Sequence, residues 1–210
     1  MKNEKIKLFL FLICFGAVAT ISTAQSSLTI DASQMMTNFS YKNSLETKDK
    51  GYSTNYSGAY TLGYLYHIND NIVLRGGLGM RKAGATLVVD NTNYEWDLQY
   101  ANIKLGGGYI YGEGRFQPYL MLSGYFGYLL KANQRINNED FDIIDTGSLD
   151  KSDIGIILSP GVQMKISDDI TAYSEFGYLR GLKNIETTAD GQKANNTAYS
   201  LTLGLAFTIK

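Results

Sequence analysis

Apolar and polar residues alternate along most of this chain. In the last stretch, "TAYSLTLGLAFTIK", every second residue from Tyr199 to Ile209 is large and apolar. The residues between them are small and uncharged, where a soluble strand would carry Lys, Glu or Asp. Side chains on a strand point alternately to opposite faces. The stretch is therefore predicted to be a strand with one bulky apolar face and one face of small residues.

The same alternation marks further segments, and no helical 3.6-residue period separates them. Repeated strands without helices indicate an all-β fold. The eight predicted strands are 27–36, 56–68, 72–83, 96–111, 116–131, 152–166, 170–184 and 196–209.

Short and long connections alternate strictly between these strands. In an up-and-down arrangement all short turns then lie at one end of the fold, together with both termini, and all long loops lie at the other end. The short turns are "NDN" (69–71), "GEGR" (112–115) and "SDD" (167–169), and the long polar loops are 37–55, 84–95, 132–151 and 185–195.

The choice of inner face follows from volume. Eight strands close into a barrel whose interior is only just filled by side chains, so rows of Tyr, Phe and Leu do not fit inside, whereas Gly, Ala, Ser and Thr do. A bulky apolar exterior needs lipid, and closure satisfies every backbone group there. We therefore predict an eight-stranded antiparallel up-and-down transmembrane β-barrel. Aromatic girdles are expected from Tyr66, Tyr109, Tyr111, Phe116 and Tyr119 near the turns, and from Tyr56, Trp96 and Tyr128 near the loops.

The N-terminus is typical of a secretory signal peptide. Three lysines precede the apolar run "LFLFLICFGAVA", and Ser22 and Ala24 fit a cut before Gln25. This predicts a signal peptide over 1–24 and a barrel domain over 25–210, exported to the outer membrane. The only cysteine, Cys14, lies inside the apolar run, so no disulfide is expected in the exported chain. A charge balance of -1 without a basic, aromatic-rich run argues against nucleic acid as a partner.

Candidate chemistry is sparse. The single histidine, His67, is expected on the inner face beside the "NDN" turn, away from the loop end where lipid-modifying sites lie. The loop 137–153 carries six acidic residues, but it lacks the spacing of an EF-hand and favours a solvated loop over a calcium site. No phosphate-binding loop, paired-cysteine site or nucleophile elbow is present. We therefore expect no enzyme activity, no cofactor and no metal.

Charged residues on the predicted inner face form a hypothetical ionic network that fills the lumen. Its members are Arg75, Arg81, Lys104, Asp153 and Glu175. Distance from the short turns places Arg75 and Glu175 at similar depth, so these two are expected to pair, with Lys104 as an alternative partner. Asp153 is expected to pair more loosely with Arg81. Such pairing is required because an unpaired buried charge costs several kcal/mol.

The second half of the chain resembles the PorT-like family, small outer-membrane β-barrels of Bacteroidetes-type bacteria. The matching stretches are "MRKAGATL" (80–87), "YANIKLGGGY" (100–109), "QPYLMLSGYFGYLLKA" (117–132), "DIGIILSPGV" (153–162) and "SEFGYLRGLKNI" (174–185), followed by the terminal strand. At Lys104, Gly177 and Lys210 the residue types differ from those usual in the family. The resemblance implies an eight-stranded barrel in the outer membrane, and it implies no activity and no functional residue.

The expected function is therefore a non-enzymatic envelope barrel with a plugged lumen. Its role would be structural or interactive, accessory to secretion or surface contact. Its expected partners are outer-membrane lipid and other envelope proteins, reached through the long loops or the periplasmic rim. Two alternatives stay open at this point: an outer-membrane enzyme acting on lipid or peptide, and a soluble, secreted, calycin-like ligand carrier.

Overall fold

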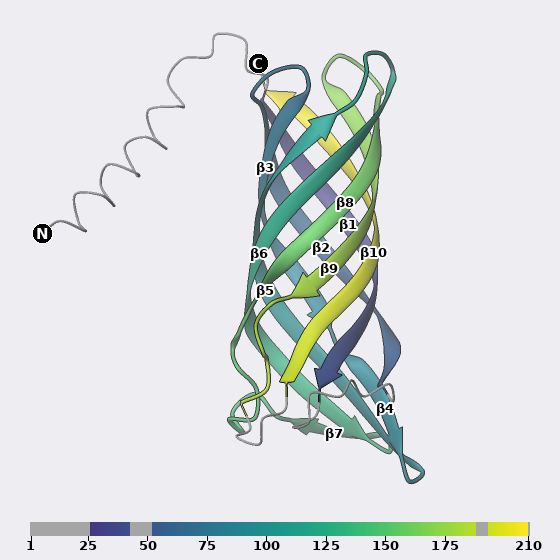
Figure 1. Ribbon diagram of the computed structural model, residues 1–210, viewed down its shortest axis with the longest axis vertical. Helices are drawn as coiled ribbons and strands as arrows, with labels where there is room; N and C mark the ends of the chain where they lie inside the picture. Colours follow the sequence, from purple (N-terminus) through teal and green to yellow (C-terminus); the bar gives the residue numbers. More distant parts are fainter. Residues whose placement is uncertain (1–25, 43–51, 188–192, 210) are drawn as a thin grey trace, which may run out of the picture.

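The chain forms a closed barrel of antiparallel strands in the computed structural model, which describes residues 26–42, 52–187 and 193–209. The ring runs β1–β2–β3–β5–β6–β8–β9–β10 and closes through the pairing of β10 with β1. Figure 1 shows these strands tilted around one common axis. The bounds are β1 Ser26–Lys42, β2 Tyr52–His67, β3 Ile72–Ala83, β4 Ala85–Val89, β5 Thr92–Ile110, β6 Phe116–Ile136, β7 Glu139–Asp142, β8 Ser152–Lys165, β9 Ile170–Gly181 and β10 Lys193–Ile209.

The eight-stranded ring predicted from the alternation is confirmed, and so is its antiparallel order. The three short turns lie at the end where β1 begins and β10 ends, and β4 and β7 lie at the opposite end (Figure 1). These ends are called the turn end and the loop end below. Among the residues described, no helix is long and apolar enough to cross a membrane.

Three of the four long connections are shorter than predicted, and two of these contain hairpins. Residues 84–95 are not a polar loop, because β4 and the first residues of β5 pair across a two-residue turn at Asp90 and Asn91. Both turn residues have positive φ, as tight hairpins require. Residues 132–142 likewise continue β6 and return in β7 around Asn137 and Asn138. The barrel wall therefore extends well past the predicted strand ends at the loop end.

The two faces of the wall are distributed as the volume argument predicts. Leu62, Leu78, Leu105 and Leu203 are all more than 60% exposed on the outside. Ser27, Thr29, Thr61 and Thr202 are buried in the lumen. A wall with this apolar exterior matches a lipid solvent.

Larger side chains also enter the lumen, which the sequence reasoning missed. The outer girdle predicted near the turns includes Tyr119, but this prediction is wrong, because Tyr119 is only 6% exposed and points inward. Tyr100, Tyr125 and Tyr173 are buried there as well. Space for these rings comes from glycines on the same inner face, since Gly155, Gly161 and Gly204 lie directly against the rings of Tyr125, Tyr119 and Tyr173.

Candidate functional site: the charged lumen

The first charged group of the lumen joins β3, β6 and β9. The guanidinium Nη2 of Arg75 lies 2.5 Å from Oε1 of Glu175, and the hydroxyl of Tyr119 donates a hydrogen bond of 2.7 Å to the same oxygen. The Arg75 guanidinium also lies 5.3 Å from the centre of the Tyr173 ring, which adds a cation–π contact. Glu175 thus has two donors, Arg75 and Tyr119, and Arg75 has both a carboxylate and an aromatic ring beside it.

A second charged group lies nearer the loop end and is drier. Nη2 of Arg81 lies 2.7 Å from Oδ2 of Asp153, and their side chains are 3% and 0% exposed. Tyr125 and Asn196 donate hydrogen bonds of 3.0 and 2.8 Å to the same carboxylate oxygen. The Arg81 guanidinium is held 4.7 Å from the ring centre of Tyr100 and 5.1 Å from that of Tyr125.

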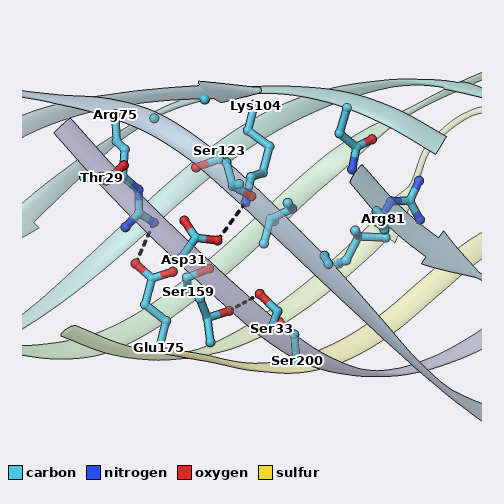
Figure 2. Close-up of a pocket in the computed structure, with 18 of the residues that line it drawn as sticks. Thr29, Asp31, Ser33, Arg75, Arg81, Lys104, Ser123, Ser159, Glu175 and Ser200 are labelled. Atoms are coloured by element: carbon cyan, nitrogen blue, oxygen red, sulfur yellow. Dashed lines mark hydrogen bonds and ion pairs between the residues drawn. The ribbon is translucent and has the colours of Figure 1, made fainter. Parts of the chain in front are cut away.

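A central cavity of about 60 Å³ separates the two groups. Nζ of Lys104 and Oδ1 of Asp31 face each other in it at 3.9 Å, which is an ion pair but too long for a hydrogen bond. Figure 2 shows Lys104 above Asp31, with the Arg75–Glu175 pair beside them and serine hydroxyls on the opposite wall. Among the described residues, these three ion pairs place three cations and three carboxylates in the middle of the lumen, where their charges balance.

The loop end of the lumen is closed by apolar side chains. Leu98, Leu129 and Ile185 are at most 1% exposed and pack with Tyr100. The segment after β9 is tied to the segment before β8 by backbone hydrogen bonds, among them Asp150 N–H to the Ile185 carbonyl. Nζ of Lys183 lies 2.8 Å from Asp150 and, with the backbone amide of Ser152, holds the pKa of that carboxyl below its usual value.

The turn end of the lumen is hollow. A cavity of about 640 Å³, called the turn-end vestibule below, opens there and reaches down to Arg75, Tyr119 and Tyr173. Its apolar wall belongs to a cluster that includes Leu65, Val73, Ile110 and Met121. His67 lines this vestibule and therefore lies at the turn end of the lumen. The lumen is therefore asymmetric, sealed towards the loops and open towards the turns.

The acidic loop does not gather into a metal site. Within residues 26–42, 52–187 and 193–209, no group of three or more His, Cys, Asp or Glu side chains is placed to hold a metal ion. Asp140 and Asp145 form exposed ion pairs with Arg135 and Lys151 instead.

All five residues of the hypothetical network point into the lumen. The structure brings together Arg75 with Glu175, and Arg81 with Asp153. The second pair was expected to be looser, but its atoms lie 2.7 Å apart and it is the more buried of the two. Lys104 faces Asp31 rather than Glu175. Asp31 was missed, although it lies between Thr29 and Ser33 on the small-residue face of its strand, a position that signals an inward charge.

Comparison with known proteins gives a family and a fold. The family described as outer membrane protein beta-barrel domain matches residues 8–207. The Neisserial surface protein A structure is 15% identical, with a TM-score of 0.51, and the match covers 89% of this chain and 99% of that one. OprG from Pseudomonas aeruginosa is 11% identical, with a TM-score of 0.50, over 90% of this chain and 99% of that one. At such identities the likeness shows the fold alone. The comparison with curated protein sequences gives no match.

Proposed function

Because the chain belongs to the outer-membrane β-barrel family, we propose that it is a non-enzymatic barrel with a plugged lumen and a structural or interactive role in the envelope. Membership of an outer-membrane family removes the soluble calycin-like carrier from consideration. The barrel wall contacts outer-membrane lipid through its apolar exterior. The loops and the turn-end rim are the surfaces for protein partners, which makes the barrel accessory to secretion or to surface contact.

One observation carries the plugged lumen: both ionic groups lie across it, and only a cavity of about 60 Å³ remains between them. That space accommodates a few water molecules but no continuous aqueous path. The apolar seal around Leu98 and Ile185 closes the loop end as well. Uptake through the barrel would require several tightly packed, charge-balanced side chains to move together.

We also propose that the chain is a PorT-like member of this family. The stretches that support the resemblance have architectural roles, which agrees with a resemblance that carries no activity. In "YANIKLGGGY" on β5, Asn102, Lys104 and Gly106 alternate on the lumen side. In "DIGIILSPGV" on β8, Asp153 is the buried partner of Arg81.

Conductance in planar lipid bilayers tests the proposal. The refolded wild-type barrel, from which residues 1–24 are omitted, is expected to show no steady current. Insertion is verified separately by the faster gel migration of the folded barrel and by protection from added protease. A stable, ohmic channel in the wild type would falsify the plugged lumen and restore a transport function.

A further inference from the structure

The turn-end vestibule has the size, the wall and the charge of a ligand site. We propose that it binds a small amphiphilic organic cation, a molecule with an apolar body and an ammonium group. Its volume of about 640 Å³ lies within the range of small-molecule pockets. Because the loop end is sealed, the vestibule is a blind pocket, open only at the turn end, rather than a segment of a channel.

The inner wall of the vestibule suits the apolar body of such a ligand. Leu65, Val73, Ile110 and Met121 line it, and each is buried within the apolar cluster at this end of the lumen. The rings of Tyr119 and Tyr173 complete the wall near the floor. An apolar group entering between these side chains exchanges water contacts for hydrocarbon contacts.

The rim of the vestibule suits a cation. Each of the three short turns places one exposed carboxylate on it: Asp70 after β2, Glu113 after β5 and Asp168 after β8. Lys165 is the opposing cation on this rim. Across the part of the chain that the structure describes, none of the three carboxylates takes part in an ion pair. They are therefore available to a ligand.

The floor orients the ligand. Arg75 is the charged residue of the floor, and its carboxylate partner Glu175 is already held by Arg75 and Tyr119, so the floor offers no free carboxylate to an ammonium group. The ammonium group is thus directed to the rim and the apolar body to the interior. Thr29, which is 4% exposed, lines this floor, and its hydroxyl oxygen has no hydrogen-bond partner. It offers one hydrogen bond to a ligand that reaches the floor.

The test uses 4-phenylbutylamine as the probe and 4-phenylbutanol as its neutral counterpart. Both are titrated by calorimetry and by ligand-observed NMR into the refolded barrel in phosphatidylcholine nanodiscs, and empty nanodiscs correct for partition into lipid. The amine is expected to bind about tenfold more tightly than the alcohol, because only the amine meets the carboxylates of the rim. Added salt should reduce this difference.

Two sets of variants assign the site. The triple variant Asp70→Asn, Glu113→Gln, Asp168→Asn should remove the advantage of the amine and leave alcohol binding unchanged. The matched control Asp90→Asn, Glu139→Gln, Asp145→Asn makes the same charge change at the loop end and should bind both probes like wild type. Ala206→Phe, which fills the vestibule, should abolish binding of both probes; Thr208→Phe serves if that variant does not fold.

The proposal is overturned if the amine fails to bind at about 10 mM, well above the range of a specific site. It is equally overturned if amine and alcohol bind alike, or if the triple variant and its loop-end control behave identically. Binding of a lysine-containing tripeptide in place of the amine would assign the vestibule to a peptide partner and reject a small molecule. Each of these outcomes is independent of the conductance experiment.

Discussion

Asp153 shows how this barrel accommodates a fully buried carboxylate near the loop end of its lumen. Three donors converge on Oδ2, from Arg81, Tyr125 and Asn196, while Oδ1 has no hydrogen-bond partner. Glu175 is also a buried carboxylate paired with an arginine, but its partner Arg75 is 18% exposed and borders the vestibule. Water can therefore solvate Arg75 when its partner is lost, whereas Arg81 has no comparable access.

Removal of either carboxylate is predicted to destabilise the barrel, and the two costs should differ. Asp153→Ala leaves a buried, unpaired Arg81 and should lower the free energy of unfolding by about 3–5 kcal/mol. Glu175→Ala should cost less, because vestibule water reaches Arg75. Replacing both Arg75 and Glu175 by Leu should recover part of the Glu175→Ala loss. Urea unfolding of the barrel refolded in lipid vesicles measures each value.

A Glu175→Ala cost equal to or larger than the Asp153→Ala cost would contradict the role given to vestibule water. A double Leu variant less stable than Glu175→Ala would show that the pair itself, rather than charge compensation, stabilises this region.

Individual residues also mark the limit of sequence reasoning. The period-2 rule places Arg75, Arg81, Lys104, Asp153 and Glu175 inside, because facing is fixed once one face is assigned. It places Tyr119 inside too, since Tyr119 shares its face with Met121 and Ser123. A second signal contradicts this rule, because a tyrosine near a strand end is typical of the membrane interface and predicts the outer girdle. Which glycines leave room for a ring depends on pairing across strands, and a single sequence does not specify that.

At the scale of the elements, β3 illustrates how glycine allows two neighbouring strands to approach closely. A Cβ atom on Gly79 would clash with the carbonyl oxygen of Tyr60 and would lie 3.0 Å from Cα of Thr61, both in the neighbouring backbone of β2. On Gly76 in the same strand, the nearest atom to such a Cβ is a flexible Leu105 methyl at 3.5 Å. Of these two glycines, only Gly79 is required by the close approach of β2 and β3.

This contrast predicts opposite effects for the same substitution in one strand. Gly79→Ala must push β2 and β3 apart and should destabilise the barrel by about 1–3 kcal/mol, as overpacking does. Gly76→Ala has room, so it should be neutral or stabilising by up to about 1 kcal/mol through the lower entropy of the unfolded chain. Thermal unfolding of the two variants beside wild type provides the comparison. Equal losses in both would mean that strand propensity, and not steric contact, sets the need for glycine.

Element boundaries were the least predictable feature of the fold. The residues of β4 and β7 lie among Asn, Asp and Thr, which favour loops by composition. Their pairing depends on two-residue turns, Asp90–Asn91 and Asn137–Asn138, whose residues adopt positive φ at low cost. The dipeptides Asp90–Asn91 and Asn137–Asn138 are a sequence signal for tight hairpin turns. The polar residues around them favour a loop and so hide the strands on either side.

The whole molecule has two unlike ends, and we expect the loop end to face the cell exterior. The first and last strands of the ring begin and end at the turn end, where Ser26 of β1 pairs with Ile209 of β10, as in a barrel whose exported chain enters the membrane from the periplasm. Gly147 at the loop end and Gly114 in a short turn both have positive φ and open space around them, so each tolerates an inserted sequence.

A pair of insertions tests this orientation. A site for a specific protease is placed after Gly147 in one variant and after Gly114 in the other. Protease added to intact cells should cut only the Gly147 variant, and lysis should make the Gly114 variant sensitive as well. Cleavage confined to the Gly114 variant in intact cells would reverse the topology.

The pairing of β1 with β10 also governs when this protein can fold. Seven of the eight strand pairings in the ring join strands that are successive members of the ring in chain order. The eighth joins the first strand to the last, with Ser26 opposite Ile209. Until the final strand is present, β1 and β9 carry unpaired edges, which a bilayer does not tolerate and which invite aggregation in water. The nearly complete chain must therefore wait in an unfolded, protected state. Loss of the last strand would remove not a fraction of the stability but the folded state itself.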